Sequence, residues 1–277
     1  MPSVTIRGAR LNYLERGQGG SPVVFSHGFL WSGRMFDAQV AALAPRFRCI
    51  AYDHRGQGES EITAGGYSMD DLTLDAAALI ESLNLAPCHF VGLSMGGFVG
   101  MRLAARRPEL VRSLTLMETA ANSEPLWKIA RYRVLSAVAK VAGLRPLVGP
   151  MMRVMFGRKF LTDPARAALR AEQERLLRSN RVDGLRRTLT GILERAGVEA
   201  ELPKINCPTL IIVGEQDVAT VPARARTIHS LIPGSRLEIV PGAGHTSTVE
   251  EPDGVNAVLV PFLQTCDQPW AAASVSR

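Results

Sequence analysis

The stretch that decides the fold of this 277-residue chain is HFVGLSMGGFVGMRLAA, residues 89–105. His89–Leu93 is a short, mainly apolar run typical of a buried strand, and Gly96–Ala105 has the apolar spacing of a helix. Ser94 lies between them in the pentapeptide GLSMG, which has the Gly-x-Ser-x-Gly form. A serine between a strand and a helix lies on a sharp turn that lifts its hydroxyl out of the sheet. The sequence therefore predicts Ser94 as a nucleophile.

Strands and helices alternate on both sides of this stretch. Because strand–helix–strand repeats build parallel sheets, the alternation predicts an α/β fold with a mostly parallel sheet of eight strands flanked by helices. The other expected strands are Val4–Ile6, Ala9–Leu14, Val23–Ser26, Phe47–Tyr52, Val111–Met117, Pro208–Val213 and Leu237–Val240. The other expected helices are Met35–Leu43, a long helix capped by Ser68 and running to about Leu83, Pro222–Leu231 and Val255–Leu263.

The alternation stops between residues 122 and 200, where no strand is expected. This segment contains several Arg- and Leu-rich helical patterns, and it carries 16 Lys and Arg against 7 Asp and Glu. The chain is therefore divided into the first part of an α/β core (1–121), an all-helical insertion (122–200), and the second part of the core with a loose C-terminal tail from Asp267 to Arg277 (201–277). The basic excess fits either solvated helix faces or the attraction of an anionic substrate or surface.

Composition narrows the class of protein. Hydrophobic residues make up 46% and charged residues 21% of the chain, which is typical of a soluble globular protein. No apolar run has the length of a transmembrane helix, no secretory signal is visible and the four cysteines are far apart, so a cytoplasmic protein with reduced thiols is expected. The sequence contains no nucleic-acid-binding signature, metal-ligand cluster or dinucleotide-binding glycine motif. Nucleic acid, metal, cofactor and stable membrane insertion are therefore not expected.

A serine hydroxyl is a weak nucleophile, so it needs a base, and the base needs an orienting acid. His245 follows the last expected strand in a glycine-rich loop, and Asp217 follows the strand before it. The carboxyl ends of parallel strands meet at one edge of a sheet, so Ser94, Asp217 and His245 are expected to lie together there. Glu118, which follows strand Val111–Met117, is the alternative acid.

Together these pieces resemble the α/β-hydrolase superfamily over roughly residues 3–121 and 201–264. The motifs that carry the resemblance are HGF at 27–29, DHRGQGES at 53–60, GLSMGG at 92–97, GEQD at 214–217 and GH at 244–245. The resemblance implies that the backbone N–H groups of Phe29 and Met95 form an oxyanion hole, and that residues 122–200 are a helical cap. It also favours Asp217 over Glu118 as the acid, because the GEQD turn matches the family pattern.

The reaction that the resemblance implies is hydrolysis of a carboxylic ester or lactone through an acyl-enzyme, without a cofactor. Residues 35–39 (MFDAQ) and 116–121 (LMETAA) are similar to those of 3-oxoadipate enol-lactonases, and an anionic lactone would suit a basic cap. The expected partner is therefore a small-molecule ester or lactone, neutral or anionic, acted on by a monomer or a homo-oligomer. The expected substrate-binding residues are Leu30, Trp31, Met151 and Met155.

Three other functions stay open from the sequence. Hydrolysis of a carbon–carbon bond in a dienoate-type substrate uses the same three residues. Trp31, close to the His-Gly pair, is similar to a tryptophan of the cofactor-free perhydrolases of the superfamily. A ligand-binding receptor that keeps only the fold is the third, and an intact Ser–His–Asp set argues against it.

Overall fold

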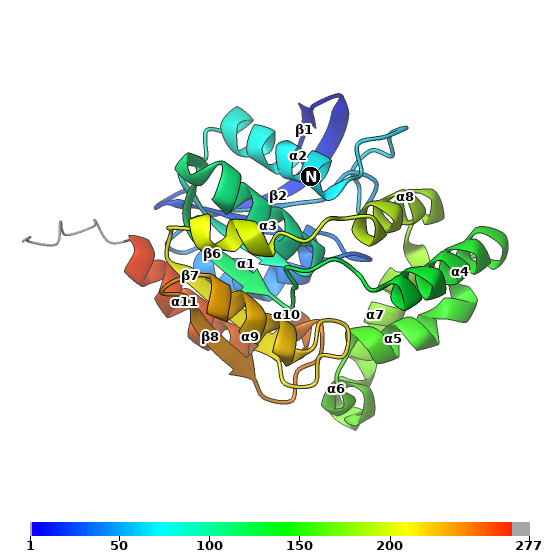
Figure 1. Ribbon diagram of the computed structural model, residues 1–277. Helices are drawn as coiled ribbons and strands as arrows, with labels where there is room; N and C mark the ends of the chain where they lie inside the picture. The colour runs from blue at the N-terminus through cyan, green and yellow to red at the C-terminus, as the bar shows by residue number, and fades with distance from the viewer. Residues whose placement is uncertain (1, 268–277) are drawn as a thin grey trace, which may run out of the picture.

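The computed structural model describes residues 2–267, in which eight strands form one sheet (Figure 1). The strand order is β1-β2-β4-β3-β5-β6-β7-β8. β1 pairs with β2 and β2 pairs with β4 in antiparallel fashion, and the remaining pairings are parallel. The strands are β1 (Ser3–Ile6), β2 (Ala9–Arg16), β3 (Pro22–Ser26), β4 (Arg48–Tyr52), β5 (Cys88–Leu93), β6 (Val111–Met117), β7 (Thr209–Gly214) and β8 (Arg236–Val240).

Two helical layers cover the faces of this sheet. In β3, Val24 packs into the core beneath α2 and α3, whereas Val23 and Phe25 pack into the core beneath α1 and α11. This alternation follows from the two-residue period of a strand, which sends successive side chains to opposite faces. The helices of the two layers are α1 (Asp37–Leu43), α2 (Met69–Ser82), α3 (Met95–Arg106), α9 (Pro222–Leu231) and α11 (Pro252–Asp267).

The expected fold class is confirmed, and the expected strands and helices occur within a few residues of their predicted bounds. Ser68 caps α2, because its hydroxyl accepts a hydrogen bond from the Asp71 N–H at 3.0 Å. One short helix near the site was not expected, α10 (Ser247–Glu250). The expected loose tail lies outside the described residues, apart from Asp267 at the end of α11.

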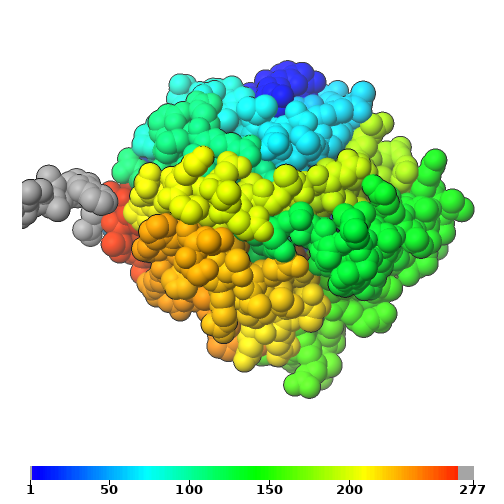
Figure 2. All heavy atoms as spheres, viewed as in Figure 1, coloured from blue at the N-terminus to red at the C-terminus, as the bar shows by residue number. Residues whose placement is uncertain are grey.

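The residues between β6 and β7 form a separate group of helices at one end of the sheet, shown in green in Figures 1 and 2. These helices contact the core through specific hydrogen bonds: Asn180 Nδ2 donates to Leu30 O at 2.9 Å, and Thr246 Oγ1 donates to Met155 O at 2.8 Å. In the first of them, α4, Ala139 is the single buried residue. They are α4 (Leu126–Ala142), α5 (Val148–Met155), α6 (Arg158–Thr162), α7 (Ala167–Ser179) and α8 (Val182–Leu193).

Within residues 2–267, every helix is too short or too polar to span a bilayer.

Candidate active site

Ser94 occupies a strained turn between β5 and α3. Its backbone has φ 52° and ψ −109°, a conformation that non-glycine residues adopt only when the surroundings enforce it. The Ser94 N–H donates to Met117 O of the neighbouring strand at 2.8 Å, which holds the turn against the sheet. A Cβ at Gly92 would collide with Gly96 O, and a Cβ at Gly96 would collide with Ser26 O. Both glycines of the pentapeptide are therefore required by close backbone approach, as predicted.

The structure brings His245 and Asp217 to this serine. His245 Nε2 lies 3.0 Å from Ser94 Oγ, and His245 Nδ1 lies 2.9 Å from Asp217 Oδ2. Asp217 can only accept a hydrogen bond when ionised, so Nδ1 carries the proton and Nε2 is free to accept from the serine hydroxyl. The three side chains come from three separate strand ends, as the chain order predicted.

Asp217 is held in its ionised form by its hydrogen bonds. Its Oδ1 accepts from the N–H groups of Ala219 at 2.8 Å and Thr220 at 3.0 Å, and its Oδ2 accepts from Thr220 Oγ1 at 2.8 Å. Burial by itself would raise the pKa of Asp217, but His245 and the Thr220 hydrogen bonds outweigh it, and the net pKa is lowered. A negative charge therefore stays beside the His245 ring.

Glu118, the alternative acid, does not contact His245. Its side chain is fully buried, and neither carboxyl oxygen has a hydrogen-bond partner among the described residues. Burial raises the pKa of Glu118 well above its usual range, and the nearby Asp217 and Glu250 carboxylates raise it further. Glu118 is therefore a buried carboxyl group without contact to His245, and Asp217 is the group that orients the imidazole.

The backbone N–H groups of Phe29 and Met95 border the same serine. Met95 is the first residue of α3, so its N–H has no acceptor within the helix. Across residues 2–267, no hydrogen bond from the Phe29 N–H to another protein atom is present either. Two free donors thus flank the turn that carries the hydroxyl.

The Phe29 loop is fixed by His27 and by Gln57, which belongs to the motif at residues 53–60. His27 Nδ1 donates to Gly28 O at 2.7 Å while its Nε2 accepts from the His54 N–H at 2.9 Å. Burial lowers the pKa of His27, which keeps the ring in the neutral form that this pattern needs. Gln57 Oε1 accepts from the Leu30 N–H at 2.9 Å, and Gln57 Nε2 lies 3.8 Å from Met95 Sδ. Gln57 therefore connects the two segments that carry the free N–H groups.

Glu250, like Gln57, positions residues of the site and was not predicted from the sequence. Its Oε1 accepts from the N–H groups of Gly244 at 3.0 Å and Thr246 at 3.1 Å, on either side of His245. Its Oε2 accepts from the Gly157 N–H at 2.7 Å, in the turn between α5 and α6. One buried carboxylate thus joins the His245 loop to the helical insertion. Gln57 lies in the DHRGQGES motif at residues 53–60, whereas no motif near Glu250 indicated its role.

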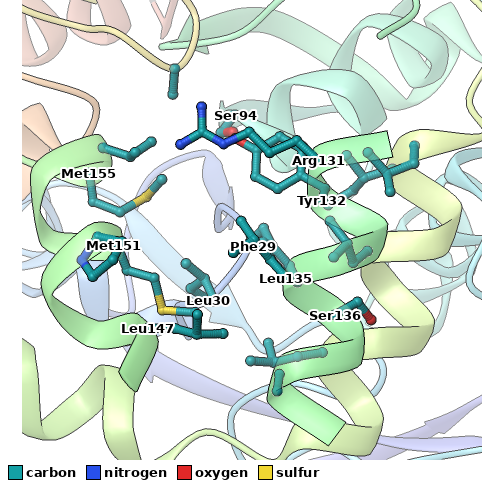
Figure 3. A pocket seen from close by; sticks show the side chains of 18 of the residues that line it. Phe29, Leu30, Ser94, Arg131, Tyr132, Leu135, Ser136, Leu147, Met151 and Met155 are labelled. Carbon is teal, nitrogen blue, oxygen red and sulfur yellow. The ribbon is translucent and has the colours of Figure 1, made fainter. Parts of the chain in front are cut away.

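A cavity of about 170 Å³ lies between Ser94 and the inserted helices (Figure 3). Ser94 and His245 are at one end, and the walls are mainly aliphatic and aromatic. Leu30, Met151 and Met155, three of the four residues predicted to bind substrate, are among the lining residues. From α4, the lining side chains are Lys128, Arg131, Tyr132, Leu135, Ser136 and Ala139.

Trp31 differs from its expected role. Its side chain is 5% exposed and packs edge-on against Phe156, with ring centroids 5.9 Å apart, and it is not part of the cavity wall. The reason is a local turn: Leu30 has a positive φ of 78°, and the Trp31 N–H bonds back to Gly28 O at 3.4 Å. The turn leaves Phe29 and Leu30 on the cavity and buries Trp31 beneath the insertion.

Most of the basic residues of the insertion do not face the cavity. Three cationic side chains, Lys128, Arg131 and Arg186, and one carboxylate, Glu124, contribute to its wall. Lys128 is 3.4 Å from Glu124, so one of the three charges is compensated. The described residues contain no cluster of His, Cys, Asp and Glu side chains that could hold a metal ion.

A protein-family model for the alpha/beta hydrolase fold matches residues 21–252 of this chain. The chain belongs to this family. The hydrolase is 33% identical over 251 residues to BpoC of Mycobacterium tuberculosis, which is named as a candidate non-heme bromoperoxidase; the match covers 88% of this chain and 94% of BpoC. It is 29% identical over 255 residues to 3-oxoadipate enol-lactonase 2 of Acinetobacter baylyi, covering 92% of this chain and 93% of the relative.

Among solved structures, a thermophilic esterase from Thermogutta terrifontis superposes on the hydrolase with a TM-score of 0.89. The two chains are 26% identical, and the match covers 96% of this chain and 98% of the esterase. The similarity therefore extends over the inserted helices as well as the α/β core. Relatives with three differently named activities share one architecture, so the architecture alone does not select among their substrates.

Proposed function

We propose that this protein hydrolyses a carboxylic ester or lactone through an acyl-enzyme on Ser94. The observation that carries the proposal is the continuous contact from Ser94 Oγ through the His245 ring to Asp217, with distances of 3.0 and 2.9 Å. These distances fall in the range in which a nucleophile and its base exchange a proton. The similarity to an enol-lactonase and an esterase supports the same class of reaction.

In the proposed first step, Ser94 Oγ attacks the carbonyl carbon while its proton moves to His245 Nε2. The C–O bond to the leaving group then breaks, and the same proton goes to the leaving oxygen. In the second step His245 takes a proton from water as the water oxygen attacks the acyl carbon. The bond from that carbon to Ser94 Oγ then breaks, the proton passes from His245 Nε2 to Ser94 Oγ, and the carboxylic acid leaves. Asp217 stabilises the imidazolium formed in each step and holds the tautomer in which Nε2 accepts.

We assign the N–H groups of Phe29 and Met95 to the oxyanion of both tetrahedral intermediates. Each donor is worth about 3–4 kcal/mol in such sites, because it meets charge that develops only during the reaction. The positive end of α3, whose first residue is Met95, adds to this stabilisation. The rigidity of the loop at Gln57 and His27 supports the assignment, because misplaced donors would lose most of this effect.

The mainly apolar cavity supports an ester or lactone with an apolar acyl chain. Lys128, nearest the His245 end through its bond to Ala219 O at 3.1 Å, and Ala139 are three turns of α4 apart. At 1.5 Å of rise per residue this is about 16 Å of helix facing the cavity. An acyl chain lying along this helix would be removed from water against Leu135 and Tyr132. The Arg131 guanidinium, which also lines the cavity, can pair with one anionic group of the substrate near Ser94.

A fluorophosphonate probe and a nitrophenyl ester series test the proposal. We expect the probe to label the protein at Ser94, as read by mass spectrometry of the labelled peptide, and to abolish ester hydrolysis in proportion. Labelling should vanish in Ser94→Ala. A folded protein that neither reacts with the probe nor hydrolyses any ester from acetate to decanoate would contradict the proposal and revive a receptor role.

A second candidate is peracid formation on the same site, favoured by the 33% identity to BpoC. Here hydrogen peroxide replaces water as the acceptor of the acyl group, giving a peracid and free Ser94. The peracid then transfers one oxygen atom to bromide, giving hypobromous acid and the carboxylate, so no bound cofactor is required. Bromination of monochlorodimedone in acetate and peroxide, lost in Ser94→Ala, would support this reaction; its absence beside active ester hydrolysis would exclude it.

A further inference from the structure

The first inserted helix, α4, presents an apolar stripe to solvent. Leu126, Trp127, Val134 and Val141 are 84, 66, 64 and 89% exposed, which is unusual for side chains of this size on one helix. At 100° per residue these four positions, together with Val138, occupy an arc of about 120°. The opposite side of the same helix lines the cavity. In Figures 1 and 2 α4 lies at the outer surface of the molecule, away from the sheet.

Cationic side chains border this stripe on both sides. On the same helical projection Arg131 follows one edge, and Arg133 and Lys140 follow the other. The helix carries four Lys and Arg residues and no Asp or Glu over Leu126–Ala142. The acidic side chains within ion-pair distance come from other segments: Glu124 lies 3.4 Å from Lys128, and Glu194 lies 3.6 Å from Arg133. Arg131 and Lys140 have no ion-pair partner among residues 2–267.

We propose that the outer face of α4 docks the protein on an anionic lipid surface. In this arrangement the Trp127 indole and the valines enter the boundary between headgroups and acyl chains, while the flanking cations contact the phosphate layer. Trp is suited to this boundary because its ring is apolar and its N–H can remain hydrated. In the proposed arrangement α4 lies in the plane of the lipid surface and the α/β core stays outside it.

Charge argues for a lipid surface rather than a second copy of the chain. Two copies meeting through this face would bring three bordering cations of one α4, Arg131, Arg133 and Lys140, against the same three of the other, with no acidic residue on either α4. Like charges at a close interface cost binding energy, whereas the same charges attract phosphate headgroups. The cations beside the stripe therefore favour an anionic lipid surface over a second copy of the chain.

Because α4 also forms a wall of the cavity, docking through its outer face would bring the lipid surface close to the site. Tyr132, Leu135 and Ala139, one turn or less from the exposed stripe, line the cavity that ends at Ser94. A single helix thus separates the docking face from the site, and an amphiphile leaving the lipid surface would meet the cavity within the width of that helix. The docking itself does not depend on the chemistry at Ser94.

Vesicle sedimentation tests the proposal with the full chain. The probes are vesicles of phosphatidylglycerol mixed with phosphatidylcholine, and vesicles of phosphatidylcholine alone. We expect binding to the anionic vesicles at least about tenfold tighter than to the neutral ones, and weakening as salt approaches about 1 M, where the Debye length is about 3 Å. Val134→Glu with Val141→Glu should reduce binding by about tenfold or more, while turnover of a soluble butanoate ester is unchanged.

The matched control is Leu74→Glu with Ile239→Glu, which places two charges on exposed apolar positions of α2 and β8. This control should bind as the parent does. Failure of the parent to bind anionic vesicles, or equal binding by the α4 variant, would overturn the proposal. A dimer of the parent that sedimentation shows to be lost in the α4 variant would assign the face to a second copy and overturn it as well. Loss of ester hydrolysis in Ser94→Ala with vesicle binding intact would separate docking from catalysis.

Discussion

The turn at Ser94 and the helix α4 border the same cavity, yet they are built in opposite ways. Around Ser94 the strand, the helix and both neighbouring strands are buried, and each polar group of the Ser94–His245–Asp217 set has a partner. Along α4, Ala139 is the one buried residue, and apolar side chains face both the cavity and solvent. The proposed catalytic residues thus lie on a well-packed part of the molecule, whereas α4, in the cavity wall, packs on the rest of the protein through few buried side chains.

This difference predicts that the two regions control different properties, the rate of the reaction and the choice of substrate. A 3.0 Å proton-transfer contact tolerates little movement, so its residues are held by the sheet and by hydrogen bonds. A wall of Leu, Met, Tyr and Ala side chains can adapt to different acyl groups, because apolar contact has little directionality. Substitutions in the first region should therefore change kcat, and substitutions in the second should change which substrate is used.

The largest expected effect is that of Ser94→Ala. Removing the nucleophile should lower kcat on a nitrophenyl ester by about 10⁴–10⁶, with little change in stability. His245→Ala should cost a similar factor, and the double variant little more, because the two residues act as a unit. The measurement is steady-state kinetics beside thermal unfolding. Near-full turnover in Ser94→Ala or His245→Ala would contradict the assignment of catalysis to the Ser94 region.

Gln57→Ala should have the next largest effect. The Leu30 N–H would lose its acceptor and the Phe29 loop its connection to Met95, while the triad contacts stay in place. We expect kcat to fall about tenfold to a hundredfold with a smaller change in KM, which is less than the loss of an oxyanion donor outright. An unchanged kcat in a protein that still unfolds cooperatively would show that Gln57 is not needed to hold the Phe29 loop in place.

Ala139→Trp sharpens the comparison on the side of the insertion. The indole would fill the cavity at the end remote from Lys128, so kcat/KM for a decanoate ester should fall by about tenfold or more, with butanoate hydrolysis nearly unchanged. The matched control is Ala130→Trp, at an exposed position of the same helix that is outside the cavity wall. Equal loss on both esters would place the acyl chain elsewhere.

Glu250→Gln should have the smallest effect on turnover and a measurable effect on stability. The amide cannot accept from all three N–H groups, and leaving the buried Gly157 N–H unpaired costs about 1–3 kcal/mol. Glu251→Gln, which weakens contacts to Lys159 and Arg166 at a more exposed position, should cost about 1 kcal/mol or less. Urea unfolding measures both free energies.

The pH dependence of the same variant has a definite sign. Burial raises the pKa of Glu250 from 4.5 to about 7 in the folded protein. A carboxyl with a raised folded pKa contributes most stability below its unfolded pKa, and that contribution is lost as the pH rises to the folded value. The stability cost of Glu250→Gln should therefore shrink between about pH 4.5 and 7. A cost that grows over this interval would contradict the raised pKa.

Much of the site could be predicted because its signals are local in the chain. The pentapeptide around Ser94 predicted a strand-to-helix turn, and the structure has the strained φ and the close glycine contacts that such a turn needs. Asp217 and His245 were predicted from their places after strands, since parallel strands bring such places to one edge. Glu118 follows a strand in the same way, and in the structure the contact to His245 is made by Asp217 and not by Glu118.

Other features could not be predicted because they depend on residues far apart in the chain. Trp31 and Leu30 are adjacent in sequence, but Leu30 lines the cavity whereas Trp31 packs against Phe156 outside the cavity wall. The exposed stripe of α4 could not be predicted because the cavity-facing side of the helix is apolar too, so the sequence shows no clear division into two faces. Glu250 acquires its role from Gly157, which approaches it only when the insertion packs on the core.

The sequence by itself determined the strand–helix alternation, the turn at Ser94 and the order in which nucleophile, acid and base occur. Each of these follows from residues within a few positions of one another, through periodicity and the space that a glycine leaves. Tertiary structure decided which carboxylate meets His245, which side chains form the cavity and which face of α4 meets water. Those outcomes depend on contacts between segments of the chain that local spacing does not specify.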